Sequence, residues 1–447
     1  MDFKGARAVV VGLGKSGLAA IDLLAHKGAD VRACDSRPAA QIPGAAATLE
    51  RLGVEFRPQS WEALEDADWI VISPGVPADL EVLERARRKG IHVIGEIELA
   101  GFFLQGETIG ITGSNGKTTT TALVGHILRE CGIPAQVGGN IGTAAAAAMV
   151  ATSQPGQWNV LELSSFQLET AERFRARVGV ALNVTQDHLD RHHSFEAYAA
   201  AKGRLFETQE SGDCAVLNAD DAVAAGYAAQ AGGRAFWFSL ARAARPGIWL
   251  DGRRLLYEGR LLIDAGEIPL KGRHNIENVM AAAAAAHEAG APLDAIAAAI
   301  RTFRAVEHRL EFVRTVRGVD FYNDSKATNV DSTLKAVEAF AGGLWVILGG
   351  KDKGSDYSPL GAPLAAKARA ALLIGAATPL IAAQLKGSAP LIECGTLEKA
   401  VETAFRQAAP GDTILLAPAC ASFDQFDSYE HRGRVFKQLV NGLEAAS

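Results

Sequence analysis

Two glycine-rich loops, each between an apolar strand and a helix, constrain the fold of this chain most strongly. The first lies in VVGLGKSG, residues 10–17, and the second in GITGSNGKTTT, residues 110–120. A glycine-rich turn that leads from a buried strand into a helix is typical of parallel α/β sheets, where the helix N-terminus binds phosphate groups. We therefore expect an α/β protein with two phosphate-binding loops.

The length and the pattern of apolar runs predict three α/β units. The chain has 447 residues, which at about 150 residues a domain corresponds to three domains. Short β-branched runs bounded by glycine recur along the chain and indicate parallel strands. We place the units at residues 1–97, 98–305 and 306–447.

Composition excludes several classes of protein. The net charge of −6 argues against a protein that binds nucleic acid through its phosphates. Five scattered cysteines without a CxxC pair indicate neither a disulfide framework nor a zinc site. We find no signal peptide and no apolar run of about 18 residues. These features predict a cytoplasmic protein with no membrane partner.

The first loop has three possible roles. Its segment GLGKSG, residues 12–17, matches G-x-G-x-x-G, and Asp35 ends the next strand, where a ribose-binding acid would lie. That pattern favours NAD, but the unit is half of a doubly wound dinucleotide fold, and no hydride-transfer site follows. Backbone N–H groups at a helix N-terminus bind any diphosphate, and SPGVP, residues 73–77, would face the same crevice. A UDP-linked substrate fits equally well, and a turn needed only for packing remains a third reading.

The second loop predicts an ATP site. In GSNGKTT, residues 113–119, the first glycine lies three residues before Gly116. In the usual P-loop this spacing is five residues. Gly113 and Gly116 still allow the backbone to wrap the phosphates, and Lys117 reaches the β- and γ-phosphate oxygens. The Thr118 hydroxyl is a ligand for Mg²⁺.

Polar residues follow the next two strands. Glu162 ends the strand in LELSSFQLE, and Asp187 and His188 follow the strand in NVTQDHLDRH. Ligands bind at the carboxyl ends of parallel strands, so Glu162 and His188 are candidates for a magnesium site near the γ-phosphate. Lys202 falls on a helix that Ser194 could cap, and sequence alone favours a solvated surface lysine there.

The third unit predicts a site for an anionic small molecule. Its strand ends carry Asp324, Lys326 and Thr328 in YNDSKATN, Lys353 in GGKDKG, and Ser422 in APACASFDQF, which we expect at a strand-to-helix turn. Cations, hydroxyls and helix N-termini gather there. We find no Ser/His/Asp triad, GxSxG elbow or HExxH helix, so a hydrolase has no support.

In combination and order, these segments resemble the Mur ligases of peptidoglycan synthesis over essentially the whole chain. The motifs are TGSNGKTT, LELSSFQLE, NVTQDHLDRH, HNIENV, EHRLE, NDSKATN, GGKDKG and PACASFDQF. The resemblance is closest to the members that add D-glutamate to UDP-N-acetylmuramoyl-L-alanine. It implies a Rossmann-like N-terminal domain, a central P-loop-type ATPase with a mostly parallel sheet, and a Rossmann-like C-terminal domain. It also implies that the first loop binds UDP.

The resemblance further implies residue roles and a reaction through an acyl phosphate, with ATP and Mg²⁺. Lys117, Glu162, His188 and Lys202 would be catalytic, and Thr118, Glu162, His188 and Lys202, the last as a carbamate, would hold the metal. ATP would contact Gly113, Ser114, Asn115, Gly116, Lys117, Thr118, Thr119, Asn275, Asn278, Arg309 and Asp324. The UDP-linked substrate would contact Gly14, Ser36, Arg37, Ser73, Gly75 and Asn140. The amino-acid substrate would contact Lys326, Thr328, Lys353, Ser422 and Tyr429. Tyr429 stands where the family has Phe, and its expected role is that of a backbone amide.

Other members of the wider family are alternatives. An alanine-adding ligase would show a different N-terminal glycine pattern, and the diaminopimelate- or lysine-adding ligases carry a DNPR-type motif that this sequence lacks. A folylpolyglutamate synthetase would lack the N-terminal UDP-type domain. The rival from another class is a non-catalytic nucleotide-sugar-binding protein, against which Lys117, Glu162 and His188 argue. We expect a monomer.

Overall fold

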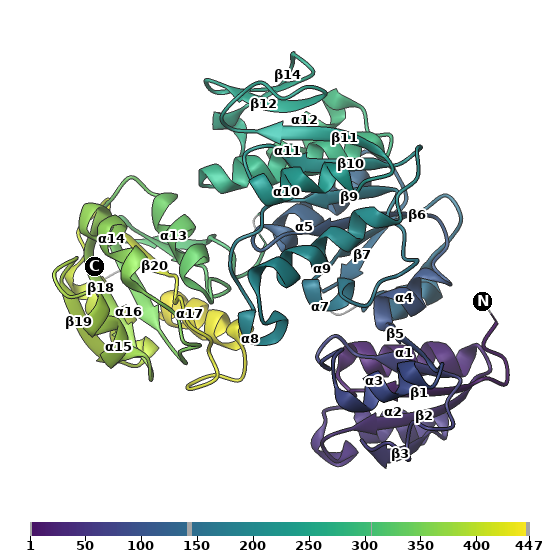
Figure 1. The fold of residues 1–447 in the computed structure, drawn as a ribbon. Helices are drawn as coiled ribbons and strands as arrows, with labels where there is room; N and C mark the ends of the chain where they lie inside the picture. The colour runs from purple at the N-terminus through teal and green to yellow at the C-terminus, as the bar shows by residue number, and fades with distance from the viewer. Residues whose placement is uncertain (1, 141–144, 305, 444–447) are drawn as a thin grey trace. The chain divides into compact units, whose positions relative to one another are not determined.

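The computed structural model describes residues 2–140, 145–304 and 306–443 as an α/β fold with three sheets (Figure 1). The prediction of an α/β fold with mostly parallel sheets is confirmed. By their contacts, residues 1–267 and 277–301 form one compact unit, and residues 268–276 and 302–447 form a second. The limits predicted for three domains stay a prediction, and residue 305 lies outside the described residues.

The first sheet is five-stranded and parallel, in the order β3-β2-β1-β4-β5. Its elements are β1 (Arg7–Val11), α1 (Lys15–His26), β2 (Asp30–Asp35), α2 (Ala45–Leu52), β3 (Glu55–Pro58), β4 (Trp69–Ile72), α3 (Glu81–Arg88) and β5 (His92–Gly95), and helix α4 (Glu96–Gly101) follows. Alternate β1 residues face opposite sides: Val10 packs with α1 and α2, and Val9 and Val11 pack with α3. Both faces are thus covered by helices.

The second sheet has nine strands, in the order β14-β13-β12-β11-β10-β9-β6-β8-β7. Only the β12–β13 and β13–β14 pairs are antiparallel. Its strands are β6 (Glu107–Thr112), β7 (Ala135–Gly139), β8 (Trp158–Glu162), β9 (Val178–Ala181), β10 (Cys214–Asn218), β11 (Arg234–Ser239), β12 (Gly247–Asp251), β13 (Arg254–Tyr257) and β14 (Arg260–Asp264). The helices are α5 (Lys117–Glu130), α6 (Ala146–Met149), α7 (Ser165–Leu168), α8 (Leu189–His192), α9 (Phe195–Glu207), α10 (Ala222–Gly226), α11 (Arg273–Glu288) and α12 (Leu293–Thr302). Strand β6 lies between β8 and β9, so that all three carboxyl ends meet at one edge.

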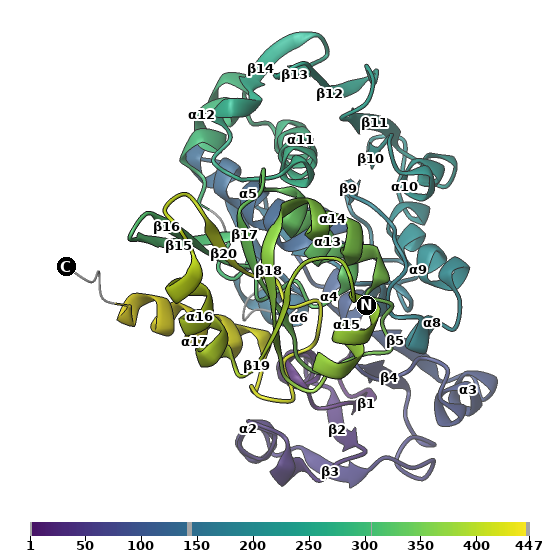
Figure 2. The ribbon, with the colours of Figure 1, turned by 90° about the vertical axis from the view of Figure 1, so that its left-hand side faces the viewer.

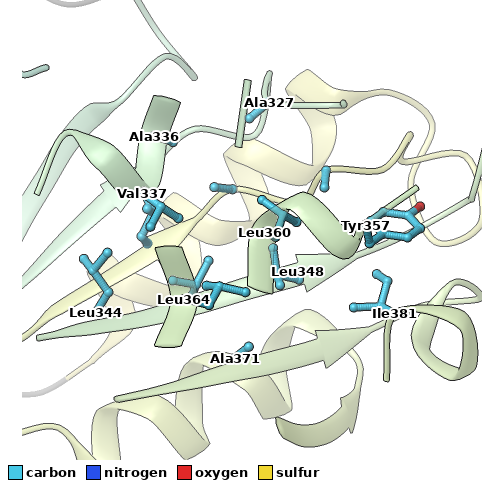
Figure 3. Close-up of a cluster of buried hydrophobic side chains, with 14 of the residues drawn as sticks. Ala327, Ala336, Val337, Leu344, Leu348, Tyr357, Leu360, Leu364, Ala371 and Ile381 are labelled. Atoms are coloured by element: carbon cyan, nitrogen blue, oxygen red, sulfur yellow. The ribbon is translucent and has the colours of Figure 1, made fainter. Parts of the chain in front are cut away.

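The third sheet, in the second unit, has the order β15-β16-β20-β17-β18-β19, with only β15 antiparallel. Its elements are β15 (Glu311–Val316), β16 (Val319–Asn323), α13 (Val330–Glu338), β17 (Leu344–Gly349), α14 (Gly361–Lys367), β18 (Ala368–Ile374), α15 (Thr378–Gln384), β19 (Leu391–Gly395), α16 (Leu397–Gln407), β20 (Thr413–Leu416) and α17 (Tyr429–Gly442). Helices α16 and α17 lie side by side on one face (Figure 2). On the other face, Val337 of α13, Leu364 of α14 and Ile381 of α15 pack on the strands (Figure 3).

Two further findings concern elements that the sequence predicted. Helix α17 begins at Tyr429, seven residues after Ser422, so Ser422 lies in a loop and not at the start of a helix. Two backbone hydrogen bonds hold this loop, because the Ser422 carbonyl accepts from the amides of Gln425 and Phe426. Across the described ranges, no helix is long and apolar enough to cross a membrane.

Candidate active site

The phosphate loop between β6 and α5 requires its glycines. Gly113 has φ 152° and Gly116 has φ 88°, in the region that favours glycine. A Cβ on Gly116 would lie 2.2 Å from the Oδ1 atom of Asn278. Asn278 is buried on α11 and its Oδ1 accepts from the Thr120 hydroxyl at 3.3 Å, so it packs directly beneath the loop. Any side chain at position 116 would displace it.

Hydrogen bonds from the segment after β9 fix the shape of the loop. The Asn183 side chain accepts from the Asn115 amide at 2.9 Å and donates to the Asn115 carbonyl at 3.1 Å. The Ser114 hydroxyl donates to the Thr185 carbonyl at 3.0 Å and lies 2.9 Å from the Tyr198 hydroxyl. The loop is therefore held in place by protein contacts, as a preorganised phosphate site requires.

Lys117 and two threonines begin α5, at the helix N-terminus. The Lys117 ammonium donates to the carbonyls of Gly113 at 2.6 Å and Ser114 at 2.9 Å, so it lies over the loop itself. Thr118 is half-buried and Thr119 is buried. A cation and the positive end of a fourteen-residue helix thus face the same small volume.

Glu162 ends β8 and offers one unused oxygen beside the loop. Its side chain is 3% exposed, and Oε1 accepts from the Asn140 amide group at 3.0 Å. Within the part of the chain that the structure describes, Oε2 is buried and has no hydrogen-bond partner. A buried carboxylate oxygen without a partner is costly, and a hard cation such as Mg²⁺ satisfies it. The residues present therefore fit a magnesium ion.

Lys202 is 1% exposed, so the reading of it as a solvated surface lysine is wrong. Its ammonium donates to the Gly113 carbonyl at 2.9 Å and lies 4.5 Å from the centre of the Tyr198 ring. Burial, with the repulsion of Lys117, lowers the pKa of Lys202 well below its usual value, while Asp187 and Glu162 act in the opposite direction. Ser194 caps α9 as predicted, since its hydroxyl accepts from the Ala197 amide.

His188 lies on the turn that begins α8, and its side chain is 46% exposed. Its φ of 53° is left-handed. The ring meets Phe166 edge-on with 4.8 Å between centres, and the imidazole Nε2 is 3.6 Å from Asp187 Oδ2. Phe166 also stacks on buried His192, whose pKa burial lowers to about 4. The neighbouring His192 is therefore neutral near pH 7.

A cleft of about 780 Å³ opens at the first loop, and all six residues predicted for the N-terminal substrate line it. They are Gly14, Ser36, Arg37, Ser73, Gly75 and Asn140. Asn140 belongs to the segment after β7, so the cleft reaches the edge of the second sheet.

The glycines of the first loop and of the turn after β4 divide into two kinds. A Cβ on Gly17 would lie 1.8 Å from the Gly12 carbonyl oxygen, and one on Gly12, with φ 89°, would lie 2.5 Å from Val76 Cγ2. By contrast, a Cβ on Gly14 would meet nothing closer than 3.9 Å, and one on Gly75 would meet open space. Packing does not require Gly14 or Gly75, so their small size leaves room in the cleft for a ligand.

Asp35 shapes the first loop from beneath. Its Oδ2 accepts from the Leu13 amide at 2.8 Å, and its Oδ1 accepts from the Arg37 amide at 2.9 Å. Both carboxylate oxygens therefore bind backbone amides of the cleft wall. These two hydrogen bonds explain why an aspartate ends β2, and the explanation does not require Asp35 to bind the ribose of a dinucleotide.

In the second unit, Arg309 and Asp324 form an electrostatic pair. Asp324 follows β16 and is buried, which raises the pKa of its carboxyl to about 7, while Arg309 acts to lower it. Asn275 is buried near the start of α11, and its side chain donates to the Lys271 carbonyl at 2.6 Å.

All five residues predicted for the amino acid lie on segments that contact one another. The Lys326 ammonium is 3.9 Å from the centre of the Tyr429 ring. The Thr328 amide donates to the Lys326 carbonyl at 2.8 Å, and buried Ser422 follows β20. Lys353 lies on the loop after β17, where neighbouring Asp352 accepts from the Gly354 and Ser355 amides.

Near the same unit's start, Glu307, His308 and Glu311 place three ligand atoms within 4.8 Å of one another. The Lys437 ammonium donates to Glu307 at 3.0 Å and to Glu311 at 2.5 Å. A cation of the protein itself thus balances these carboxylates, and the cluster is an ion-pair network.

Comparison with known proteins decides the family. Three family models match the chain: "Mur ligase MurD-like, N-terminal domain" over residues 6–95, "Mur ligase middle domain" over 111–286, and "Mur ligase, glutamate ligase domain" over 308–420. The chain belongs to the Mur ligase family. Its predicted family is thereby confirmed.

Similar Mur ligases cover the whole chain. The UDP-N-acetylmuramoylalanine–D-glutamate ligase of Solibacter usitatus is 63% identical over 99% of both chains. The protein of the same name from Acidobacterium capsulatum is 51% identical over 98% of this chain and 97% of its own. Among solved structures, the UDP-N-acetylmuramate–alanine ligase of Thermotoga maritima has a TM-score of 0.61 at 19% identity and covers 98% of this chain and 99% of its own, which shows the shared fold.

Several residues at this site were not singled out from the sequence. Tyr198, Phe166 and Arg191 all lie around Lys202 or His188, and Arg191 donates to the Val76 carbonyl of the cleft wall at 2.7 Å. For Tyr198 a signal existed, because it stands four residues before Lys202 on one helix and so shares its face.

Proposed function

We propose that this Mur ligase joins D-glutamate to UDP-N-acetylmuramoyl-L-alanine in an ATP-dependent reaction that forms an amide bond, ADP and phosphate. Full-length identity of up to 63% to ligases of that name supports the proposal. The observation that carries it is the position of Asn140, which lines the cleft and also donates to Glu162 beside the phosphate loop. A substrate in the cleft can therefore bring its far end to the γ-phosphate.

The first step is phosphoryl transfer to the substrate carboxylate. A carboxylate oxygen attacks the γ-phosphorus, the bond to the ADP oxygen breaks, and an acyl phosphate forms. Lys117 and the N-terminal amides of α5 balance the negative charge that builds on the phosphoryl oxygens. We assign the remaining ATP contacts to residues 113–119 and Asn278 in the first unit and to Asn275, Arg309 and Asp324 in the second.

In the second step, the amino group of D-glutamate attacks the acyl carbonyl, and phosphate leaves from the tetrahedral intermediate. The amine loses a proton as the C–N bond forms. We assign the binding of D-glutamate to Lys326, Thr328, Lys353, Ser422 and Tyr429, whose cations and hydroxyls suit a dicarboxylate.

Glu162, Thr118 and His188 would hold Mg²⁺, together with a modified Lys202. Mg²⁺ supplies charge neutralisation at the phosphate oxygens when it is bound. The Lys202 amine adds CO₂: its nitrogen forms a bond to carbon, one C=O π bond opens to place the negative charge on oxygen, and the nitrogen releases a proton, which gives a carbamate. The buried, pKa-lowered amine supports this step, because only the neutral amine reacts.

The same proposal covers the organisation of the protein. It consists of a UDP-substrate domain at residues 1–97, an ATPase domain at 98–305 and an amino-acid-binding domain at 306–447, and acts as a cytoplasmic monomer.

Release of phosphate tests the function. The protein is incubated with ATP and UDP-N-acetylmuramoyl-L-alanine, and D-glutamate, L-glutamate, L-alanine, L-lysine or meso-diaminopimelate is added in turn. We expect release only with D-glutamate. Equal release with L-lysine or diaminopimelate would assign the chain to another Mur ligase activity, and no release with any of them would favour the non-catalytic binding protein.

A further inference from the structure

The largest fully buried side chain in the described part of the chain belongs to Arg432, on the second turn of α17. Its guanidinium makes five hydrogen bonds. Nε donates to the Ser325 hydroxyl at 3.0 Å, and Nη2 donates to the Ser325 carbonyl at 2.9 Å. Both terminal nitrogens donate to the Cys420 carbonyl at 3.2 Å, and Nη1 also reaches the Ala421 carbonyl at 3.4 Å.

Every one of these acceptors is neutral. Among the described residues, Arg432 forms no ion pair with a carboxylate. The Cys420 thiol and the Asp424 carboxylate act on it electrostatically and favour its charged form, and Asp424 itself accepts from the Ala376 amide at 2.9 Å. Burial lowers the pKa of Arg432 to about 10, so the group stays charged near pH 7. A buried charge without a charged partner is costly to the fold, which points to a use for that charge.

The guanidinium joins three segments that carry predicted contacts of the amino-acid substrate. Ser325 precedes Lys326, and Ala421 precedes Ser422. Ser325 also extends the connection to α17, because its hydroxyl donates to the Tyr429 carbonyl at 2.8 Å. One side chain therefore sets the spacing of Lys326, Ser422 and Tyr429.

A second anchor acts on the neighbouring loop. The Tyr357 hydroxyl, visible in Figure 3, donates to Asp352 at 2.7 Å and lies 3.0 Å from the Cys420 sulfur. Lys353 follows Asp352, so its loop is tied to the same Cys420 segment that Arg432 holds. The predicted contacts thus rest on one connected network inside the second unit.

We propose that Arg432 is a positioning residue for the amino-acid substrate, whose guanidinium fixes the segments bearing Lys326, Ser422 and Tyr429 and places positive charge behind them. The inference rests on the proposed function and adds to it a residue that does not touch the substrate. Glutamate brings two carboxylates, so a positive charge in a water-poor setting favours its binding. Lysine cannot replace the arginine, because an ammonium lacks the planar fork that reaches Ser325 and Cys420 together.

The test compares Arg432→Lys and Arg432→Met with Arg434→Met, an exposed arginine two residues later on the same helix. KM is measured for D-glutamate, for ATP and for the UDP-linked substrate. We expect Arg432→Lys to raise KM for D-glutamate about tenfold or more, a loss of roughly 1.4 kcal/mol in binding. The same variant should change KM for ATP by no more than about twofold, even though the proposed ATP contacts Arg309 and Asp324 belong to the same unit as Arg432. Arg434→Met should change none of the three constants.

A partial reaction separates positioning from damage to the fold. Without D-glutamate, hydroxylamine traps the acyl phosphate as a hydroxamate, and Arg432→Lys should form it at the wild-type rate. If KM for D-glutamate stays unchanged, or if it rises together with KM for ATP and the hydroxamate rate falls, Arg432 has no positioning role. If the wild-type protein uses a different amino acid, the proposed function is wrong, and KM for that amino acid then decides the role of Arg432. Arg432→Lys alone carries the test if Arg432→Met does not fold.

Discussion

At the scale of single residues, Lys117 should be indispensable for phosphoryl transfer. Its ammonium lies over the phosphate loop, where charge develops in the transition state. We expect Lys117→Ala to reduce kcat on the order of 100- to 1000-fold, which corresponds to about 3–4 kcal/mol. Phosphate release by a variant whose circular dichroism matches the wild type measures this effect, and near-normal turnover would remove the loop from the mechanism.

Lys202 should act through an anionic group. Because the amine is buried beside Lys117, a carbamate would replace repulsion with an oxygen ligand for the metal. We expect Lys202→Ala to lose about 100-fold or more in kcat and to recover part of it with added acetate or formate. Lys202→Glu should retain more activity than Lys202→Ala, since it restores a negative charge.

The matched control for Lys202 is Glu196→Ala, an exposed residue on the same helix, which should keep wild-type activity. If Lys202→Ala keeps most of its activity, or if carboxylates restore nothing and Lys202→Glu is no better than alanine, the carbamate is excluded as a catalytic requirement.

Glu96 should make stability depend on pH. Its Oε1 accepts from the Ala147 amide at 2.6 Å. Burial raises its pKa from 4.5 to about 7, although hydrogen bonds from the Ala147 amide and the Gln167 side chain act to lower it. An acid whose pKa rises on folding binds its proton more tightly in the native state. Stability is therefore highest below pH 4.5 for this group and falls as the pH rises to about 7, by at most about 3 kcal/mol.

The variant Glu96→Gln cannot ionise and should lose this dependence. We expect its melting temperature, relative to that of the wild type, to rise between about pH 5 and pH 8. Thermal unfolding of both proteins in matched buffers measures the difference. A constant difference across this range would show that Glu96 does not change its charge there.

At the scale of elements, the first glycine-rich loop should separate packing from binding. Gly17→Ala places a Cβ against the Gly12 carbonyl, so it should lower the melting temperature and weaken binding together. Gly14→Ala would place its Cβ no closer than 3.9 Å to a protein atom, an ordinary contact without a clash, so it should leave the melting temperature unchanged. Its methyl group would instead occupy the ligand's space and weaken UDP binding about tenfold.

Titration calorimetry with UDP and with NAD completes this comparison. UDP should bind the wild-type protein and NAD should not. Equal binding of NAD would restore the dinucleotide reading, and a Gly14→Ala variant that binds UDP normally would place the diphosphate elsewhere.

The elements also show what the sequence could reveal. Buried strands such as β1 and β17 are continuous apolar runs, and the sequence predicted them directly. Strand β3 has no such run, because it is a four-residue edge strand, EFRP, in which charged Glu55 and Arg57 alternate with Phe56 and Pro58. The burial of Lys202 had a usable signal: Tyr198, Leu205 and Phe206 are buried on the same face of α9, which places the lysine inward.

Other features had no signal in the sequence. The bonds of Arg432 join Ser325 to Cys420 across 95 residues of chain, and only the parallel pairing of β16 with β20 brings the two segments together. The six residues between Ser422 and Tyr429 were likewise not predictable, since the Asp424 carboxylate in that loop accepts from the Ala376 amide at a distant strand end.

At the scale of the whole molecule, the cleft at the first loop and the phosphate loop at the second sheet belong to one compact unit and share Asn140 through its bond to Glu162. This answers why the chain has two glycine-rich loops. Under the proposed function, one loop would bind the diphosphate of the substrate and the other would bind the phosphates of ATP, and both would be needed because the substrate carboxylate must meet the γ-phosphate.

Oxygen transfer tests this account most directly. UDP-N-acetylmuramoyl-L-alanine labelled with ¹⁸O in its carboxylate is incubated with the protein, ATP and D-glutamate, and the released phosphate is analysed by mass spectrometry. Attack of the carboxylate on the γ-phosphorus leaves one labelled oxygen in each phosphate released. Phosphate without label, formed at the rate of the amide product, would contradict the proposed reaction.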